Sequence, residues 1–296
     1  MNPAIATTIE DLGRELDRYG RVAVAVSGGI DSLTLATLAA RRLGERAEMF
    51  HSLTASVPSE ATARTRELAA RFGWRLIVID AHEFAREEYL SNPVDRCYYC
   101  KQSLYAEIAR LTSAQVISGA NADDLGEYRP GLEAAREAGA RHPFVDVGVD
   151  KRTIRAIARE LGLGEMSAIP ASPCLSSRVE TGLRIDAPML DRIHCAENAV
   201  RAIIAATTVR CRVRASGVVV EIDAQALAAT DAPTRAAAAD AVAAIFGSRP
   251  AFAEYRNGSA FVMPPSPRPS PKGEGAIRSP SLGRGQGEGH NRGEGR

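Results

Sequence analysis

The sequence lacks an apolar run long enough to cross a membrane. A transmembrane helix needs about 20 mostly apolar residues, and even a run of about 18 is missing from the chain. At the amino terminus, Glu10, Asp11 and Glu15 stand where a signal peptide would carry basic and then apolar residues. We therefore expect a cytoplasmic protein without a membrane partner.

An excess of charge of either sign is also missing. The 296 residues include 37 Lys and Arg against 36 Asp and Glu, a formal net charge of +1 at pH 7. Proteins that bind nucleic acid draw much of their affinity from positive charge, and this chain as a whole offers no such field. A small-molecule substrate is therefore expected rather than a nucleic acid, although a local basic patch is compatible with the composition.

The cysteines do not suggest a disulfide framework. There are five, an odd number, which favours metal or redox chemistry in a cytoplasmic chain. Cys97 and Cys100 are separated by two residues, a spacing that lets both thiolates turn toward one metal. We expect the neighbouring Arg96 and Lys101 to lower the pKa values of these thiols. A zinc site is not favoured because no second C-x-x-C or His pair is present, and two thiols without a role are the alternative.

The other three cysteines lie in different surroundings. Cys195 falls in a helical pattern over 188–206 and Cys211 in a strand pattern over 209–213, so both are predicted to be core thiols. Cys174 lies instead in 169–178, where two prolines and three serines predict a loop that also carries Arg178.

A strand, a glycine turn and a helix follow one another near the start of the chain. Five apolar residues, 22–26, predict a strand buried on both faces of a parallel sheet. Ser27, Gly28 and Gly29 then turn the chain into a helix over 33–43. The amino-terminal N–H groups and positive dipole end of that helix suit a phosphate.

This turn reads Ser-Gly-Gly-Ile-Asp-Ser and resembles the PP-loop of ATP pyrophosphatases. Those enzymes cleave ATP between the α and β phosphates, and the loop holds the pyrophosphate. The resemblance implies an ATP site with Mg²⁺ close to Asp31. The residues that it assigns to this site are Ser27, Gly28, Gly29, Asp31 and Ser32. An ordinary tight turn is the alternative interpretation.

Strands and helices alternate after the loop. Strands are expected at 47–53, 75–79, 115–118 and 143–145, and helices at 59–72, 103–111 and 151–161. This order predicts a doubly wound parallel sheet of the α/β class, the PP-loop ATP pyrophosphatase type. Ligands of such sheets bind beyond the carboxyl ends of the strands, where Ser52, Gly119 and Asp124 are expected.

The chain is expected to divide into three parts. A PP-loop domain over 1–181 is followed by a small α+β domain over 182–263, with helices at 188–206 and 233–246, strands at 208–214 and 217–223, and short strands around Phe252 and Phe261. The last part, 264–296, is a low-complexity segment that is expected to be disordered.

Three arginines alternate along one strand of the small domain. Arg210, Arg212 and Arg214 share a face, where their charges repel one another unless an anion lies among them. A phosphorylated substrate is one such anion. A solvated edge strand that uses charge against aggregation is the alternative.

Four motifs occur in a characteristic order: the Ser27–Ser32 loop, Arg-Cys-Tyr-Tyr-Cys-Lys at 96–101, Tyr-Arg-Pro-Gly at 128–131 and Pro-Cys-Leu-Ser-Ser-Arg at 173–178. With them the chain resembles the LarE family over about residues 5–263. The resemblance implies an ATP-dependent sulfur transferase that adenylates a carboxylate of pyridinium-3,5-biscarboxylic acid mononucleotide and inserts sulfur. The thiocarboxylate product serves the nickel-pincer cofactor of lactate racemase.

The family uses two sulfur sources. Some members sacrifice a cysteine five residues before the arginine of Ser-Ser-Arg, a position that is Pro173 here. Others hold a 4Fe-4S cluster on three cysteines, and the resemblance assigns Cys97, Cys100 and Cys174 to that role. It makes Cys174, Asp31 and Arg178 catalytic. The residues that it assigns to the substrate are Arg129, Arg178, Arg210, Arg212 and Arg256. The protein is expected to form a homo-oligomer.

Three other functions are kept as alternatives. A PP-loop enzyme that thiolates tRNA can also carry three cysteines, but this chain is nearly neutral. An amidating ligase that uses ammonia would have no use for the cysteines. A nucleotide-binding redox sensor would release no pyrophosphate.

Overall fold

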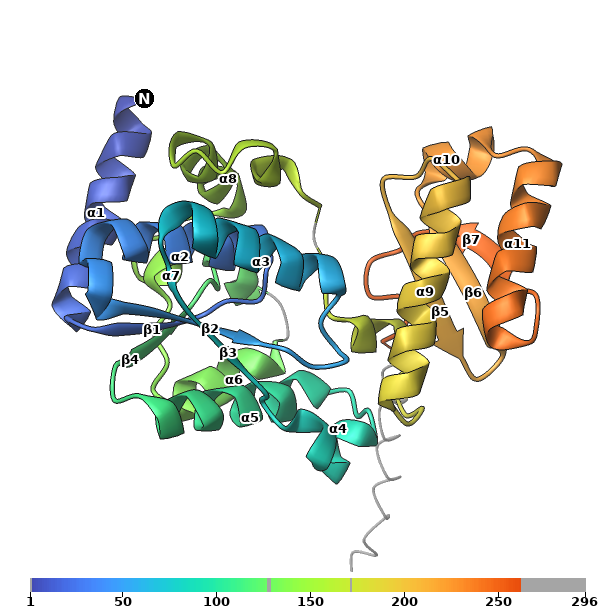
Figure 1. The fold of residues 1–296 in the computed structure, drawn as a ribbon, viewed down its shortest axis with the longest axis horizontal. Helices are drawn as coiled ribbons and strands as arrows, with labels where there is room; N and C mark the ends of the chain where they lie inside the picture. The colour runs from blue at the N-terminus through green and yellow to red at the C-terminus, as the bar shows by residue number, and fades with distance from the viewer. Residues whose placement is uncertain (1, 127–128, 171, 262–296) are drawn as a thin grey trace, which may run out of the picture. The chain divides into compact units, whose positions relative to one another are not determined.

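A parallel sheet organises the first part of the computed structural model, which describes residues 2–126, 129–170 and 172–261. Its strands lie in the order β3-β2-β1-β4 (Figure 1). They are β1 (Val22–Ala25), β2 (Ala47–Ser52), β3 (Arg75–Ile79) and β4 (Gln115–Ser118). Every pairing in this sheet is parallel, so each connection between strands crosses over the sheet.

Helices cover both faces of this sheet, which explains why β1 is apolar throughout. Val22 and Val24 pack in one buried cluster with residues of α1 and α2, whereas Ala23 and Ala25 pack in another with residues of α5. The larger helices are α1 (Pro3–Tyr19), α2 (Ile30–Leu43), α3 (Ser59–Phe72), α5 (Arg96–Leu111), α6 (Pro130–Glu137) and α8 (Lys151–Glu160). The predicted α/β class with a doubly wound parallel sheet is confirmed.

Short helical turns connect these elements. They are η1 (Gly44–Arg46), η2 (Glu83–Ala85), α4 (Glu87–Leu90), η3 (Ala122–Gly126), η4 (Gly164–Ala168) and η5 (Leu175–Arg178). The helix that was expected over 103–111 begins earlier, at Arg96, so Cys97 and Cys100 lie in its first turns rather than in a loop.

The strand expected at 143–145 is wrong, because this segment is the short helix α7 (Pro143–Asp146). Pro143 stands in the first turn, where proline favours a helix, and it has no N–H for a strand ladder. Just before α7, Arg141 forms an isolated parallel bridge with Ile117 of β4.

A second, smaller sheet follows, with the strand order β5-β6-β7. Its elements are α9 (Ala187–Ile203), β5 (Val209–Arg214), β6 (Gly217–Ile222), α10 (Ala224–Ala229), α11 (Ala232–Phe246) and β7 (Ala251–Glu254). β5 and β6 are antiparallel, whereas β6 and β7 are parallel. The strand expected around Phe252 is confirmed, but the one around Phe261 is wrong because a turn occupies 257–260.

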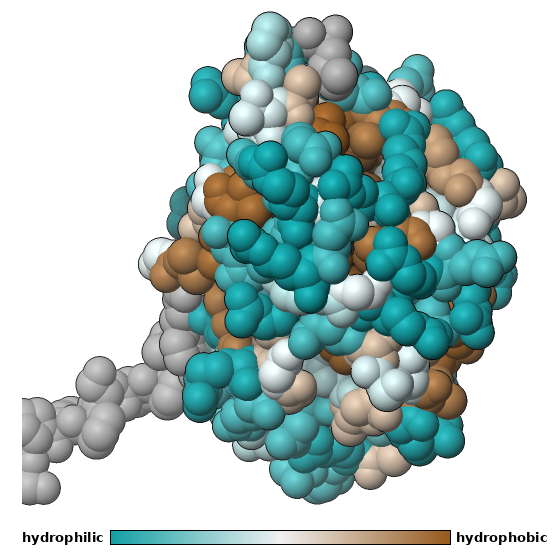
Figure 2. All heavy atoms as spheres, turned by 90° about the vertical axis from the view of Figure 1, so that its left-hand side faces the viewer, coloured by the Kyte–Doolittle hydropathy of each residue, from teal (hydrophilic) through white to brown (hydrophobic). Residues whose placement is uncertain are grey.

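The surface on the side of α1 is mostly hydrophilic (Figure 2), and its apolar residues form small separate spots. Ion pairs contribute to this surface. Arg42 of α2 contacts both Asp17 and Glu10 of α1. Within the described residues, this view shows no broad apolar area that a partner would need to cover.

Among the helices in the described part of the chain, none has the length and apolarity that crossing a membrane requires. The predicted low-complexity segment 264–296 and Tyr128 of the third motif lie outside the described residues. The domain boundary expected at 181/182 stays a prediction.

Candidate functional site

The Ser27–Ser32 loop connects β1 to α2 at the carboxyl edge of the large sheet. Its conformation is fixed by the Ser32 hydroxyl, which donates to the Gly29 carbonyl at 2.9 Å and accepts from the Ser27 amide at 3.1 Å. Gly29 is the N-cap of α2, and no side chain of the described residues forms a capping hydrogen bond there. The predicted loop residues therefore form the kind of helix terminus at which phosphates bind.

Two glycines let other backbone segments approach this loop closely. Gly28 has φ +78°, and a Cβ there would lie 2.6 Å from the carbonyl oxygen of Ala61 in α3. A Cβ at Gly119 would lie 2.8 Å from the amide nitrogen of Ser32. Gly119 therefore touches the loop directly, as expected of a nucleotide site at the end of β4.

Asp31 of the loop forms an ion pair with Lys151, the first residue of α8. Burial raises the pKa of Asp31 above its ordinary value, and the nearby Asp124 carboxylate adds to this effect while Lys151 opposes it. The Oδ1 atom of Asp31 is buried without a hydrogen-bond partner among the described residues. Sequence reasoning missed Lys151, because its pattern indicated only the start of a helix.

Asp124 lies close enough to Asp31 to act on its charge, and it also accepts a hydrogen bond from the Asn121 amide at 3.1 Å. Arg129, which was expected to face the substrate, forms an ion pair of 2.9 Å with Asp124. Two carboxylates beside a phosphate-type loop are suitable ligands for Mg²⁺.

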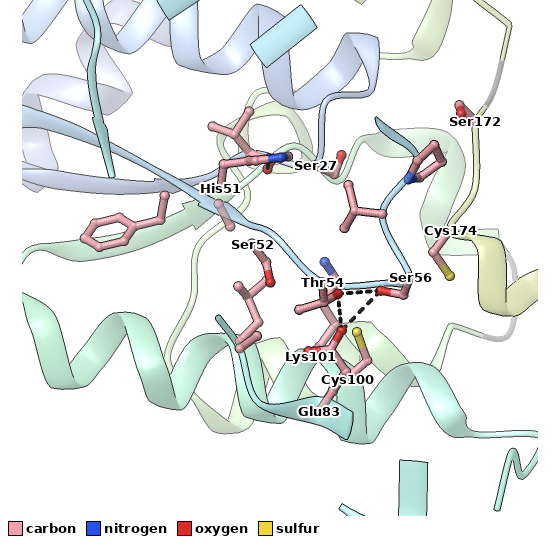
Figure 3. A pocket seen from close by; sticks show the side chains of 17 residues that line it. Ser27, His51, Ser52, Thr54, Ser56, Glu83, Cys100, Lys101, Ser172 and Cys174 are labelled. Carbon is pink, nitrogen blue, oxygen red and sulfur yellow. Dashed lines mark hydrogen bonds between the residues drawn. The ribbon is translucent and has the colours of Figure 1, made fainter. Parts of the chain in front are cut away.

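A cavity runs from the loop to two cysteines (Figure 3). Ser27 and Ser52 line it on the side of β1 and β2, and Cys100 and Cys174 line it on the other side. Ser52 Oγ has no hydrogen-bond partner within the described part of the chain, whereas His51 is fully buried and bonded at both ring nitrogens. The apolar residues that line the cavity are Ala25, Val26, Phe50, Val57, Pro58, Ala81 and Leu104.

Burial changes the pKa of the two thiols of α5, Cys97 and Cys100. Burial raises the pKa of Cys100 to about 12, and it also raises the pKa of Cys97. Arg96 and Lys101 act in the expected direction, but burial outweighs them, so the expected lowering is wrong. The charge of Cys174 acts on both Cys97 and Cys100, and that of Cys97 acts on Cys100, so these sulfurs lie within electrostatic range.

Within the described residues, no group of three Cys, His, Asp or Glu side chains is arranged to hold one metal ion. In an iron–sulfur cluster each thiolate binds a different iron, so the sulfurs need to be gathered without converging on one point. Cys97, Cys100 and Cys174 would be the protein ligands of such a group.

A buried carboxylate that was not predicted lies beside Cys100. Glu83 is 2% exposed and accepts hydrogen bonds from Thr54 at 2.6 Å and Ser56 at 3.1 Å. Figure 3 shows this network on the thiol side of the cavity. Thr54 and Ser56 follow β2 and Glu83 follows β3, and none of the three belongs to a recognisable motif. The sequence alone therefore does not single them out.

Arg178, predicted as a catalytic and substrate residue, is 1% exposed and held by protein groups. It forms a bidentate ion pair with Glu197, at 2.9 Å and 3.2 Å. Its Nη1 donates to the carbonyls of Pro173 at 2.6 Å and Cys174 at 3.0 Å. The guanidinium therefore holds the backbone that carries Cys174.

A second cavity is rich in arginine and adjoins the first. The charged groups that line it are Arg64, Arg178, Arg201, Arg210, Glu60 and Glu197, together with His194. Burial lowers the pKa of Arg210 to about 10, and the positive charge of Arg178 contributes to this shift. An anion in this cavity would relieve that repulsion. Pro58 and Ser172 line both cavities.

The arginines of β5 have a protein anion among them. Arg212 and Arg214 both form ion pairs with Glu221 of β6, at 3.0 Å and 2.8 Å. Arg210 and Arg212 are buried, so the alternative of a solvated edge strand is wrong for them. Arg210 lines the second cavity, whereas Arg256 is exposed and its carbonyl accepts a bond from Arg212 at 3.4 Å.

Cys195 and Cys211, the two cysteines that were expected in the core, differ from each other. Cys211 is fully buried, as predicted. Cys195 is exposed on α9, so its expected place in the core is wrong.

Fold and site together define an α/β protein with a phosphate-type loop after its first strand and a thiol-lined cavity beside that loop. No protein-family model matches the chain. An uncharacterized protein of Synechocystis sp. is 34% identical over 197 residues, which cover 65% of this chain and 73% of that protein. An uncharacterized protein of Methanocaldococcus jannaschii is 29% identical over 192 residues, covering 64% and 72% of the two chains.

The third relative carries a functional name. The chain is similar to pyridinium-3,5-bisthiocarboxylic acid mononucleotide synthase of Lactiplantibacillus plantarum, with 31% identity over 218 residues that cover 70% of this chain and 76% of the synthase. The chain belongs to the family of this synthase, the LarE family. Membership implies an enzyme that uses ATP.

Proposed function

We propose that the protein is an ATP-dependent sulfur transferase. It adenylates a carboxylate of pyridinium-3,5-biscarboxylic acid mononucleotide and converts this carboxylate to a thiocarboxylate. One observation carries the proposal: a single cavity joins Ser27, the first residue of the loop, to Cys100 and Cys174. A carboxyl group activated at the loop would therefore form within reach of the thiol side of the same cavity.

The second cavity supports a phosphorylated substrate. Its arginines Arg64, Arg201 and Arg210 suit the phosphate of a mononucleotide. Because Pro58 and Ser172 border both cavities, a substrate can place its phosphate among the arginines and its pyridinium ring toward the loop. We expect Arg210 to contact the substrate and Arg178 to act by holding the Cys174 backbone.

The chemistry follows from this arrangement. A carboxylate oxygen of the substrate attacks the α-phosphorus of ATP, and pyrophosphate leaves at the loop. A sulfur nucleophile then attacks the acyl carbon, the bond to the AMP oxygen breaks, and AMP leaves with its electron pair. The cluster, when bound, supplies the sulfur.

Lys101 is the cation of the first cavity. Burial alone would lower the pKa of Lys101, but Tyr105 and the three cysteines hold it above its ordinary value. The ammonium group therefore keeps its charge, and it would stabilise the negative charge that develops on the adenylate during sulfur transfer.

The decisive experiment uses anaerobically reconstituted full-length protein with ATP, Mg²⁺ and the pyridinium mononucleotide. AMP, pyrophosphate and a product with one oxygen replaced by sulfur are expected. Asp31→Ala should lose AMP and pyrophosphate formation while keeping its iron. The same mixture with tRNA in place of the mononucleotide should yield no thiolated product, and thiolated tRNA alone would overturn the proposal.

Cysteine variants test the sulfur side. Wild-type protein should bind about four irons with broad absorption near ~400 nm, as a thiolate-ligated cluster does. Cys174→Ala should lose this absorption, and the matched Cys195→Ala should keep it. Retention of the cluster in Cys174→Ala would contradict the ligand assignment.

A further inference from the structure

Cys174 stands immediately before a turn that is buried on all sides. The turn is η5, and Leu175, Ser176, Ser177 and Arg178 are all buried. Two of its groups are bonded to distant parts of the chain: the Leu175 amide donates to the Ser56 carbonyl at 2.8 Å, and Ser176 Oγ contacts Tyr89. The direction of the Cys174 side chain is therefore set by how this turn is held.

One side of the turn is held by Tyr89 of α4. The phenol oxygen of Tyr89 lies 2.6 Å from Ser176 Oγ, and the two side chains are 1% and 0% exposed. The Tyr89 ring packs edge-on against Phe84 with centroids 5.3 Å apart. The Tyr89 ring is therefore held by a contact that does not involve the turn.

The opposite side is held by Arg178, whose Nη1 donates to the Cys174 carbonyl while Glu197 binds the rest of the guanidinium. The Ser177 hydroxyl donates to the same carbonyl at 2.7 Å. Tyr89 lies in α4, a few residues before the helix with Cys97 and Cys100, so the Tyr89–Ser176 contact links the turn after Cys174 to the segment that leads into that helix.

We propose that Tyr89 is a positioning residue, whose buried hydroxyl holds Ser176 so that the Cys174 thiol faces the thiols of α5. The inference deepens the proposed function and rests on it, because it gives Tyr89 a role in gathering the sulfur ligands. Groups brought together from distant segments act faster when their geometry is fixed in advance.

The test measures thiol proximity in protein that contains neither ATP nor a cluster. A short bifunctional alkylating reagent replaces the protons of two neighbouring thiols with one bridge, and peptide mass spectrometry gives the rate at which Cys174 is joined to Cys97 or Cys100. Tyr89→Phe removes only the hydroxyl. Tyr19→Phe is the matched control, since its phenol bonds Glu15 at 2.8 Å in a different part of the fold.

Bridging should slow about fivefold in Tyr89→Phe, the factor that one buried hydrogen bond represents, and should not change in Tyr19→Phe. Ser176→Ala should slow it similarly, and the double variant should be no slower than the single ones. Anaerobic reconstitution should give less bound iron in Tyr89→Phe than in Tyr19→Phe at equal thermal stability.

Unchanged bridging in both Tyr89→Phe and Ser176→Ala would overturn the inference. If Tyr89→Phe loses bridging and also has a lowered melting temperature, Ser176→Ala decides. Slower bridging in Ser176→Ala at an unchanged melting temperature supports the inference, and unchanged bridging overturns it. If wild-type protein bridges as expected but makes no thiocarboxylate, the proposed function fails while the role of Tyr89 in holding the turn stands.

Discussion

The ammonium group of Lys151 contacts the Asp31 carboxylate from 120 positions further along the chain. It compensates a carboxylate whose other oxygen is buried without a partner within the described residues. Under the proposed function, Mg²⁺ would bind the Asp31 carboxylate when ATP binds at the loop, and Lys151 would then be available to a phosphate oxygen.

We therefore expect Lys151→Met to weaken ATP binding about tenfold or more, the loss typical of one charged hydrogen bond. Lys151→Arg should retain part of the affinity because it keeps the charge. Titration with ATP by calorimetry, at several Mg²⁺ concentrations, measures the effect. Equal affinity of Lys151→Met and wild type would show that the lysine only neutralises Asp31.

Gly28 and Gly29 offer a matched pair of loop variants. Gly28→Ala puts a Cβ 2.6 Å from the Ala61 carbonyl at a positive φ, whereas the nearest atom to a Cβ at Gly29 is 3.5 Å away. We expect Gly28→Ala to abolish pyrophosphate release and Gly29→Ala to retain a measurable fraction. A pyrophosphate assay at saturating ATP compares them, and equal rates would contradict the geometry given for the loop.

The buried pair of Arg178 and Glu197 makes stability depend on pH. Burial alone would raise the pKa of Glu197, but Arg178, Arg210 and Arg201 together hold it below its ordinary value. The pKa of Glu197 is lower in the folded than in the unfolded protein. The ion pair therefore stabilises the fold above the unfolded pKa of about 4.3, and this contribution is lost as the pH falls through the folded pKa.

Glu197→Gln should therefore lower the free energy of unfolding at pH 7 by about 3–5 kcal/mol, because it leaves the Arg178 charge buried without its partner. The loss should shrink progressively when denaturant unfolding is repeated at a series of pH values falling below about 4. Glu133→Gln is the control, since Glu133 pairs with Arg136 on an exposed surface. A pH-independent difference between wild type and Glu197→Gln would contradict the ionic origin.

Burial of the Cys97 and Cys100 thiols predicts the order in which the cysteines react. Because the pKa of Cys100 is raised to about 12 and that of Cys97 is also raised, both stay protonated at pH 7 to 8. Iodoacetamide should modify exposed Cys195 first, and the modification of Cys97 and Cys100 should speed up as the pH rises. Mass spectrometry of timed samples follows the order, and fast labelling of Cys100 at pH 7 would contradict it.

The large sheet could be predicted from the sequence because its signals are local. The apolar run of β1, the two glycines of the loop and the alternation of strands with helices each leave a pattern within a few residues. The same reasoning failed at 143–145. These residues suit a strand, but Pro143 stands in the first turn of the helix α7.

Long-range pairs left no such pattern. Nothing near Asp31 points to Lys151, and nothing near Arg178 points to Glu197, because the fold alone brings each pair together. The arginines of β5 were expected to need a foreign anion, yet the register of β5 and β6 places Glu221 opposite Arg210. The thiol pKa values were misjudged for a related reason, since charged neighbours are visible in a sequence and burial is not.

Pro58 and Ser172 line both cavities, which has a consequence for a substrate with two equivalent carboxylates. In a pyridinium-3,5-biscarboxylic acid mononucleotide these groups are related by a half-turn about the axis through the ring nitrogen. With the phosphate anchored among the arginines, a rotation of the ring about its bond to the sugar would present first one carboxylate and then the other to the same loop. Both thiolations could then proceed at one active centre without release of the half-finished molecule.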